Sequence, residues 1–330
     1  MTTPIELVFK HVDGLDIMMD VYIPAKATKE NPAPVFLWWH GGGLLQGSRK
    51  AVAPHMLSAV ERYNLVLISP DYRLAPQTRL PEIYADCLDA LSFLSSPEFQ
   101  TATSNRVDTS RIVLSGSSAG GWLSLLLGTG IGAKACGLEY PPRGIDKAHI
   151  RGMAPLYPIT DLEAPFWKTP QRPVSYMDRI IPREEVQEYL DPESEKTAFC
   201  ALDSKRLIFY HYMVQEAILS SLLLDTTNIP ESSFSIALGL YKMRYAHLPP
   251  AYIITGNRDG KVPHQQSLDV VAAFDFLKSG GIVDGDLRVD YVERDGDDHS
   301  FDKEPGFDEN EMDGMYVFFW NVVGMKGWHD

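Results

Sequence analysis

The sequence predicts an α/β protein whose mostly parallel central sheet is flanked by helices on both faces. Short, continuous apolar runs recur along the 330 residues, and helix-length segments follow most of them. Strands that are apolar throughout are typical of parallel sheets, because these sheets are covered on both faces. One long stretch, residues 161–248, contains no convincing strand. We therefore expect one core that is interrupted by one insertion.

The predicted sheet opens with an antiparallel hairpin. Residues 5–9 and 17–22 are β-rich runs, and the pair Asp13-Gly14 between them supplies the turn. The later strands are expected at six apolar runs, namely 35–39, 65–69, 112–115, 150–156, 251–255 and 287–292. Open sheets of this kind carry their chemistry at the carboxyl ends of the strands. Functional residues are therefore expected in the loops that follow these runs.

The insertion is expected to form a helical cap. Residues 1–160 and 249–330 would form the core, and residues 161–248 the cap. A proline-rich aromatic segment and an acidic run precede a long apolar helical pattern at residues 207–224. An insertion at this position can serve as a lid over a site at the strand ends. Taken singly, however, its large apolar residues are better explained by packing within the cap itself.

The composition and charge exclude several classes of partner. The chain is 45% hydrophobic and 22% charged, and its formal net charge is −14. Such a field repels phosphate backbones and anionic lipids, so we expect no nucleic-acid partner and no membrane insertion. Strongly anionic substrates are disfavoured too, unless a local basic pocket overrides the average. The oligomeric state is left open by the sequence.

Cysteine usage and the chain start favour a cytoplasmic protein. Cys87, Cys136 and Cys200 are few and widely spaced, which fits neither a disulfide framework nor a zinc site. The first residues show no signal-peptide pattern, and no uncharged stretch approaches the roughly 20 residues of a membrane span. The acidic region 284–313 lacks the ligand pattern of a calcium loop and is interpreted as solvated surface. We expect no cofactor and no metal.

A candidate nucleophile lies in the run Gly116-Ser117-Ser118-Ala119-Gly120-Gly121, which follows a predicted strand and precedes a helical pattern. A nucleophilic serine on such a sharp turn projects above the sheet, and small neighbours let strand and helix approach closely. A Gly-x-Ser-x-Gly string arises by chance in about one chain in ten of this length. Its position between strand and helix is what points to Ser118 as the nucleophile.

A candidate oxyanion hole follows the strand at 35–39 in the run His40-Gly41-Gly42-Gly43. Acyl-transfer chemistry needs backbone N–H donors where negative charge develops, and glycines let the backbone approach the substrate carbonyl. We assign this role to the amides of Gly41, Gly42 and Ala119. The alternatives are a plain glycine-rich turn or a phosphate loop, but the spacing of a phosphate loop is missing. His40 itself is expected to brace the loop.

Asp259 and His299 are the candidate acid and base. Each follows one of the last two predicted strands, and serine hydrolases on α/β sheets run in the order serine, acid, histidine. Taken singly, an aspartate in a polar loop is usually solvated and a lone histidine is usually structural. The competing candidates are Asp161, Asp284 and Glu293 as the acid, and His264 and His329 as the base.

At this point the sequence resembles the hormone-sensitive-lipase-like branch of the α/β-hydrolase superfamily. The resemblance covers most of the chain outside the insertion. Besides the glycine loop and the nucleophile run, it depends on Asp71-Tyr72-Arg73-Leu74-Ala75-Pro76, the helix pattern Pro81…Asp86…Leu91, Leu156-Tyr157-Pro158, and a Gly-x-x-Asp-x-x-Val-Pro segment at 256–263. It implies the α/β-hydrolase fold and carboxylesterase activity on short- to medium-chain acyl esters.

Two departures from that family concern the acyl-chain preference. Relatives usually carry Asp or Thr before the nucleophile, and this chain has Ser117. The segment before the glycine loop is short, so the N-terminal helices that contribute to the usual cap are not expected.

The sequence therefore predicts a serine carboxylesterase for a small, apolar ester. Ser118 would attack the carbonyl, His299 would take the proton, and Asp259 would orient the imidazole. The alternatives are amide or formamide hydrolysis, and a natural-product biosynthetic hydrolase or cyclase with the same triad. A non-catalytic ligand-binding module is a further alternative, although such modules typically lose a triad member.

Overall fold

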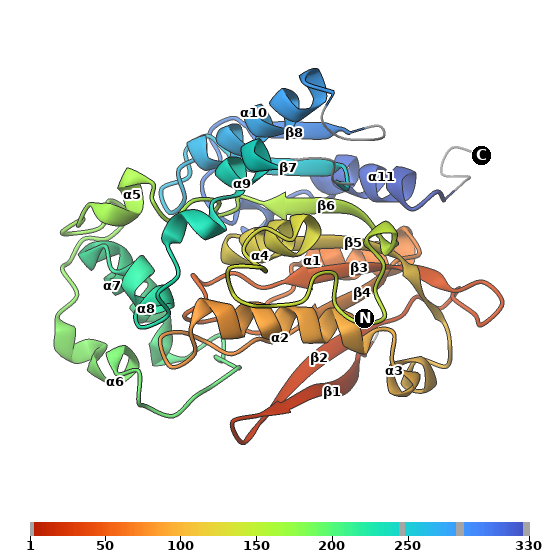
Figure 1. Cartoon of the computed structure of the whole chain (residues 1–330), viewed down its shortest axis with the longest axis horizontal. Helices are drawn as coiled ribbons and strands as arrows, with labels where there is room; N and C mark the ends of the chain where they lie inside the picture. The colour runs from red at the N-terminus through yellow and green to blue at the C-terminus, as the bar shows by residue number, and fades with distance from the viewer. Residues whose placement is uncertain (1–2, 244–247, 282–286, 326–330) are drawn as a thin grey trace.

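The computed structural model describes residues 3–243, 248–281 and 287–325. Within these residues one sheet of eight strands runs through the molecule in the order β1-β2-β4-β3-β5-β6-β7-β8 (Figure 1). The strands are β1 (Ile5–Val12), β2 (Leu15–Tyr22), β3 (Ala33–Trp39), β4 (Val66–Pro70), β5 (Val107–Ser117), β6 (Ile150–Leu156), β7 (Ala251–Gly256) and β8 (Val289–Arg294). All pairs from β4 to β8 are parallel. The predicted α/β-hydrolase architecture, with its mostly parallel sheet, is confirmed.

The opening hairpin forms as predicted. β1 and β2 pair antiparallel up to Val12 and Leu15, and β2 then pairs antiparallel with β4. The turn residues Asp13 and Gly14 have φ angles of 54° and 76°. Two successive residues in the left-handed region match the twist of the flanking strands, and Asp and Gly are the residues that adopt this conformation most readily.

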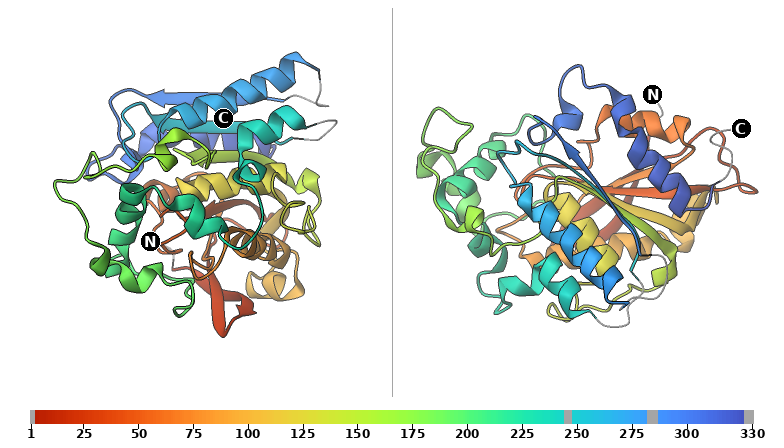
Figure 2. Two further views of the ribbon diagram at one scale, coloured as in Figure 1. Left: turned by 60° about the vertical axis from the view of Figure 1, so that its left-hand side comes forward. Right: turned by 90° about the horizontal axis from the view of Figure 1, so that it is seen from above.

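Helices cover both faces of the sheet, as the two further views show (Figure 2). The core helices are α1 (Pro54–Arg62), α2 (Leu80–Phe93), α3 (Pro97–Ala102), α4 (Ala119–Thr129), α10 (Gln265–Ser279) and α11 (Asp313–Val322). Residues of α2, α4 and α10 share one hydrophobic cluster, and residues of α1 and α11 share the other. Along β3, Val35 and Leu37 belong to the first cluster, whereas Phe36 and Trp38 belong to the second. This alternation explains why the strand is apolar throughout.

Strand register brings the functional loops together. Trp39 at the end of β3 is level with Gly116, and Ser117 at the end of β5 is level with Leu156. The last residue of β7, Gly256, is likewise level with Arg294 at the end of β8. Parallel neighbours in this register place the following loops at one edge of the sheet, next to the helices α5–α8 of the insertion (Figure 1).

The insertion is helical, and the part of it that the structure describes contains no strand. Its α-helices are α5 (Pro165–Lys168), α6 (Gln187–Leu190), α7 (Ile208–Glu216), α8 (Leu219–Leu224) and α9 (Ile236–Lys242). The division into a core and a cap stays a prediction. The last part of the insertion packs on the core, since α9 contacts α10 and the Trp122 indole donates a hydrogen bond to the Phe234 carbonyl (3.0 Å).

One expectation for the insertion is wrong. The apolar pattern at 207–224 does not form one long helix, because α7 ends at Glu216 and α8 begins at Leu219. Ala217 adopts a left-handed conformation with a φ of 55°, and the N–H of Ile218 turns back to the carbonyl of Met213. Such a helix end is usually built with glycine. Because alanine is compatible with a helix, the hydrophobic pattern alone does not indicate that the helix ends at this residue.

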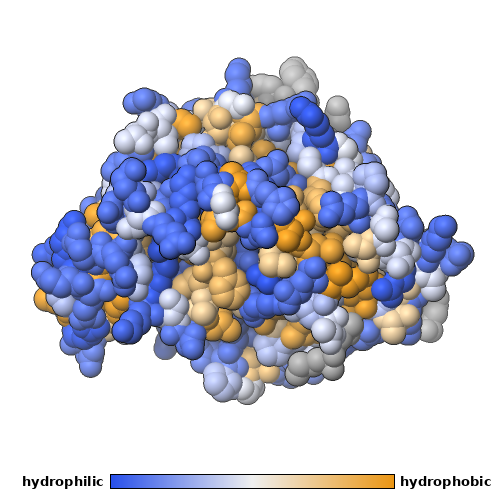
Figure 3. Space-filling view, turned by 90° about the horizontal axis from the view of Figure 1, so that it is seen from below, coloured by the Kyte–Doolittle hydropathy of each residue, from blue (hydrophilic) through white to orange (hydrophobic). Residues whose placement is uncertain are grey.

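The three cysteines are free, and Cys87 and Cys200 are buried. No helix in the described residues has both the length and the apolar character that crossing a bilayer requires. On the face drawn in Figure 3, apolar side chains form several separate groups among hydrophilic ones.

Candidate active site

Ser118 occupies a strained turn between β5 and α4. Its φ and ψ angles are 58° and −120°, which side-chain-bearing residues rarely adopt. Its N–H donates a hydrogen bond to the carbonyl of Leu156 at the end of β6 (2.9 Å), and only 4% of the residue is exposed. A Cβ on Gly120 would collide with the carbonyl oxygens of Trp39 and His40, so only glycine lets α4 approach β3 this closely. This is the geometry expected for a nucleophile that stands above a sheet.

Ser117, the departure from the family pattern, is held in the buried layer below the turn. Its hydroxyl accepts a hydrogen bond from the Trp38 indole N–H (3.2 Å). Both residues are buried, so this contact satisfies a polar group that would otherwise be desolvated without a partner. A small hydroxyl side chain therefore fits the position.

The predicted oxyanion donors lie beside Ser118. A Cβ on Gly41 would come 3.1 Å from the Ser118 Cβ, so the glycine loop passes directly over the turn. The N–H groups of Gly41, Gly42 and Ala119 donate no hydrogen bond to any residue that the structure describes. Gly42 has a φ of 102°, which requires glycine. Three uncommitted donors next to a hydroxyl are what an oxyanion hole needs.

His40 braces the glycine loop. Its ring stacks on Tyr72 with centroids 4.1 Å apart, and its Nδ1 lies 2.8 Å from the carbonyl oxygen of Gly41. The Tyr72 hydroxyl also donates a hydrogen bond to the His40 carbonyl (2.8 Å). Complete burial lowers the pKa of His40 to about 3, so the ring is neutral at physiological pH. These contacts hold the His40 ring in place against the glycine loop, as the sequence predicted.

The predicted acid and base are in contact. Asp259 follows β7, and its Oδ1 accepts hydrogen bonds from the N–H groups of Lys261 (2.9 Å) and Val262 (2.8 Å). Its Oδ2 lies 2.7 Å from Nδ1 of His299. The Asp259 side chain is fully buried, and 6% of the His299 side chain is exposed. The carboxylate therefore fixes the ring orientation and the tautomer that carries its proton on Nδ1.

His299 is placed by a loop that is tied to the acid. Asp298 accepts hydrogen bonds from the N–H groups of Gly260 (2.8 Å) and His299 (2.7 Å). The His299 ring packs against Tyr157 with centroids 4.5 Å apart, and Tyr157 directly follows the Leu156 carbonyl that binds Ser118. His299 and Ser118 thus lie on either side of the end of β6.

The last contact that the predicted triad requires is a hydrogen bond between the candidate base His299 and the candidate nucleophile Ser118. Within the described residues no hydrogen bond joins the Ser118 hydroxyl to His299, and Nε2 of His299 has no partner there. Nε2 is the nitrogen that the contact with Asp259 leaves available. Hydrogen bonds of this kind often tighten only in the presence of substrate.

None of the competing candidates that the structure describes forms a hydrogen bond with His299. Glu293 accepts from Asn257 (3.1 Å) at the surface, and Asp161 accepts from the N–H of Glu163 (3.0 Å). His264 precedes α10 and makes no side-chain hydrogen bond to a described residue. Asp284 and His329 lie outside the described residues.

The sequence did not suggest a second polar cluster behind His299. The Tyr157 hydroxyl donates to Oδ1 of the buried Asp302 (2.6 Å), and Oδ2 of Asp302 lies 3.2 Å from Nε2 of His55. Nδ1 of His55 is 2.7 Å from the Tyr316 hydroxyl. Burial alone would raise the pKa of Asp302, but the contact with His55 and the nearby charge of Lys303 bring it below its usual range. The feature of the sequence that could have indicated this cluster is the position of Asp302, three residues after the candidate base His299.

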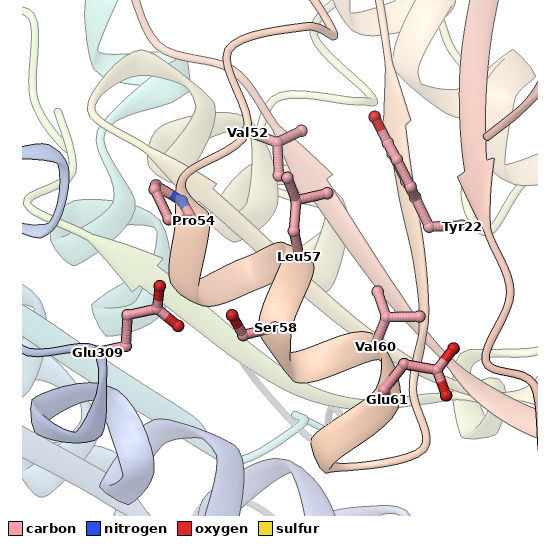
Figure 4. Close-up of a pocket in the computed structure, with 8 residues that line it drawn as sticks. All are labelled: Tyr22, Val52, Pro54, Leu57, Ser58, Val60, Glu61 and Glu309. Carbon is pink, nitrogen blue, oxygen red and sulfur yellow. The ribbon is translucent and has the colours of Figure 1, made fainter. Parts of the chain in front are cut away.

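A pocket of about 630 Å³ lies elsewhere, along α1 (Figure 4). Its lining combines apolar side chains with the hydroxyls of Tyr22 and Ser58 and the carboxylates of Glu61 and Glu309. Glu61 already accepts the N–H of Ala25 (3.0 Å). No histidine lies among the lining residues, so this pocket holds no serine–histidine pair. In the described residues no group of three or more His, Cys, Asp or Glu side chains is arranged to hold a metal ion.

Comparison with known proteins identifies the fold. The family described as alpha/beta hydrolase fold matches residues 36–197. An alpha/beta hydrolase superfamily protein from Enterococcus faecalis superposes with a TM-score of 0.66 at 18% identity, over 93% of this chain and 96% of that one. The butyrate-bound esterase Est2 from Thermogutta terrifontis gives 0.63 at 18% identity, over 99% and 97%. At this identity the likeness shows the fold alone.

In sequence, the chain is similar to parts of much longer proteins named non-reducing polyketide synthases. It is 27% identical to the non-reducing polyketide synthase ascC of Acremonium egyptiacum over 307 residues, which are 86% of this chain and 14% of that protein. It is 40% identical to the non-reducing polyketide synthase stbA of Stachybotrys bisbyi over 122 residues, 36% of this chain and 6% of that protein. The chain thus spans a small fraction of the length of these relatives.

Proposed function

Since this chain belongs to the α/β-hydrolase superfamily, we propose that it is a serine carboxylesterase that works through an acyl-enzyme. The observation that carries the proposal is the contact between Asp259 and His299 at the edge of the sheet where Ser118 occupies its strained turn. Neither a metal nor a cofactor is required for this chemistry.

The first step is acylation. The Ser118 hydroxyl attacks the ester carbonyl while Nε2 of His299 takes its proton, and Asp259 stabilises the imidazolium that forms. The tetrahedral oxyanion accepts hydrogen bonds from the amides of Gly41, Gly42 and Ala119. Collapse of the intermediate expels the alcohol, which receives the proton from His299. Water then attacks the acyl-enzyme by the same proton route and releases the acid.

We further propose that the insertion covers this site. A Cβ on Gly43 would come 2.9 Å from the ring of Tyr210 on α7, so the insertion touches the glycine loop. The Tyr210 hydroxyl also donates to the carbonyl of Lys261, two residues after the acid (3.2 Å). One side chain of the insertion therefore contacts both the donor loop and the acid loop. Free cysteines fit a cytoplasmic setting, which we include in the proposal.

The test is labelling with a fluorophosphonate probe, which reacts with an activated serine. The parent protein is expected to react, and Ser118→Ala is expected to lose the label. Ser58→Ala, which changes an exposed serine on α1, is the matched control and should label like the parent. Labelling of Ser118→Ala at the parent rate would place the nucleophile elsewhere, and an unreactive, folded parent would favour a non-catalytic module.

The pH dependence tests the base. His299 must accept the proton of Ser118 in the proposed mechanism, so ester hydrolysis is expected to depend on pH. A rate that is independent of pH from about 5 to 9 would contradict this role. Side-by-side assays of an aryl ester and the corresponding arylformamide distinguish ester hydrolysis from the formamidase alternative.

A second candidate function is the release of an acyl chain in natural-product biosynthesis. It is favoured by the similarity to polyketide synthases along most of the chain, which for the synthase Preu6 of Preussia isomera is 26% over 89% of this chain. An acyl thioester would acylate Ser118, and water or a hydroxyl of the acyl chain would then release an acid or a lactone. N-acetylcysteamine thioesters of aromatic acids, compared with their p-nitrophenyl esters, test it. A clear preference for the thioester would support this function over ester hydrolysis.

A further inference from the structure

Lys261 is an unpaired cation at the rim of the proposed active site. The chain has 30 Lys and Arg residues against 44 Asp and Glu residues, so most cations have acidic neighbours at hand. Lys261 is half-buried and yet makes no ion pair or side-chain hydrogen bond with any described residue. A half-buried ammonium in an acidic protein would gain a carboxylate partner if one were within reach.

Two acids in the adjoining loops, Asp259 and Asp298, are already committed. Asp259 accepts two backbone N–H groups and contacts His299, and Asp298 accepts the N–H groups of Gly260 and His299. Their contacts hold the catalytic loops, and neither forms an ion pair with Lys261. The ammonium is therefore available to a ligand.

An aromatic side chain from the insertion forms one wall beside this ammonium. Nζ of Lys261 lies 5.6 Å from the ring centroid of Tyr176, within the range of a cation–π contact. The same ring lies over the acid loop, since a Cβ on Gly260 would come 3.6 Å from its Cδ1. Tyr176 thus holds the lysine next to the catalytic acid and supplies a flat apolar surface.

His211 on α7 completes the cluster. Its Nδ1 lies 3.4 Å from the Tyr176 hydroxyl, and the two rings meet edge to face with centroids 5.5 Å apart. Burial and the nearby charge of Lys261 lower the pKa of His211 to about 4, so it is neutral at physiological pH. Lys261, Tyr176 and His211 together offer one positive charge and neutral hydrogen-bonding groups.

We propose that Lys261, Tyr176 and His211 form a subsite for a single carboxylate carried by the substrate. The proposal rests on the esterase function and gives its substrate class: an ester with an apolar or aromatic body and one negative charge remote from the scissile bond. One cation with neutral neighbours matches one negative charge. A dianion such as a phosphate would face the nearby Asp259 and Asp298 with only the one positive charge of this cluster, that of Lys261, to offset them. The net negative charge of the chain disfavours anionic substrates in general. The proposed subsite would be a local basic pocket that accepts one.

The experiment compares charged and neutral esters of equal length. Mono-p-nitrophenyl esters of succinate, glutarate and adipate are the charged probes, and p-nitrophenyl alkanoates with the same number of chain carbons are the neutral ones. The quantity measured is the ratio of kcat/KM for the charged over the neutral ester. We expect this ratio to exceed one for at least one length in the parent and to decrease with added salt.

The variants assign the preference to the subsite. Lys261→Met keeps the backbone N–H that binds Asp259 and should lower the ratio by roughly ten-fold, whereas Lys261→Arg should retain most of it. Tyr176→Phe keeps the ring and should lower the ratio by a few-fold at most. Lys278→Met, at an exposed lysine of α10, is the matched control and should leave the ratio at the parent value.

The outcomes separate this inference from the proposed function. If the parent turns over both ester series with no preference for the charged one at any length, or if Lys261→Met keeps the parent ratio, the subsite is wrong and the esterase stands. If the folded parent turns over neither series and resists the fluorophosphonate, the esterase proposal itself fails.

Discussion

Among the described residues, two buried histidine–aspartate pairs differ in what the second ring nitrogen meets. In the pair His299–Asp259 the carboxylate binds Nδ1, and Nε2 has no partner among the described residues. In the pair His55–Asp302 the carboxylate binds Nε2, and the Tyr316 hydroxyl occupies Nδ1. Both carboxylates are fully buried. Composition and burial therefore do not distinguish them.

The difference teaches what makes such a pair catalytic. A histidine can act as a base only if one nitrogen is free to accept a proton from a nucleophile. His55 has both nitrogens engaged inside the core, so its pair can only stabilise the fold. His299 has one nitrogen engaged by Asp259, and the other has no partner among the described residues. Substitutions in the two pairs should consequently produce opposite patterns of activity and stability.

The largest effect is expected from His299→Ala. Loss of the base should lower kcat for a p-nitrophenyl ester by roughly 10⁴-fold or more. The melting temperature should stay close to that of the parent, because Asp259 keeps its two backbone N–H donors. Steady-state kinetics and thermal unfolding on the same preparation check both parts. Substantial turnover by this variant would remove His299 from the mechanism.

Asp259→Asn should have the next largest effect. The amide can still accept from the backbone but favours the wrong tautomer of His299, so kcat should fall by about 10³- to 10⁴-fold. Asp298→Asn is the matched control in the adjacent loop, since its amide oxygen can still accept from Gly260 and His299. The control should lose far less activity, and a reversal of this order would transfer the role of the acid to Asp298.

His55→Ala should show the opposite pattern. Removing the ring leaves the Asp302 carboxylate and the Tyr316 hydroxyl buried without this partner, at a cost of about 3 kcal/mol of unfolding free energy. The kcat of the folded fraction should stay within a few-fold of the parent. Urea denaturation and kinetics at low temperature separate the two quantities. Loss of turnover in a fully folded His55→Ala protein would contradict the distinction between the pairs.

Acid should remove the contribution of the His55–Asp302 pair to the stability of the folded protein. Because the pKa of Asp302 in the folded protein lies below the usual value of 3.8, its stabilising contribution is present above about pH 4. That contribution is lost as the pH falls through the lower folded value. Urea midpoints measured from about pH 2.5 to 6 should therefore fall more steeply for the parent than for Asp302→Asn. Parallel curves would show that this carboxylate does not contribute.

The smallest effect is expected from Tyr210→Phe, which tests how the insertion is attached to the catalytic pair. The variant loses the hydrogen bond to the Lys261 carbonyl but keeps the ring against Gly43. We expect a two- to five-fold lower kcat/KM and at most about 1 kcal/mol of lost stability. Tyr212→Phe, a buried neighbour on the same helix, is the control. An equal loss in both variants would show a general packing effect.

The sheet was the most predictable part of the molecule. Continuous apolar runs such as 150–156 coincide with their strands, because a strand covered on both faces has few positions for polar residues. The start of β5 at Val107 was missed, since residues 108–111 are polar and partly exposed. The candidate residues Ser118, Asp259 and His299 could be proposed because each follows a predicted strand of the sheet.

What could not be predicted depends on contacts between distant segments. Asp302 and His55 are 247 positions apart, and no local pattern indicates that they meet. The same is true of Tyr176 and Lys261, which come from the insertion and the core. The break at Ala217 is a local feature, but alanine gives no signal for a left-handed residue.

The close approach of Gly120 to the carbonyls of Trp39 and His40 has a consequence for how this protein can diverge. The nucleophile turn and the donor loop are joined there by main-chain atoms alone, so no side-chain replacement can adjust their spacing gradually. If the insertion covers the site as proposed, selectivity would instead vary through residues of the insertion such as Tyr176 and His211, which belong to neither the nucleophile turn nor the donor loop. On that proposal, new substrates could be acquired through substitutions in the insertion while the nucleophile turn and the donor loop stay unchanged.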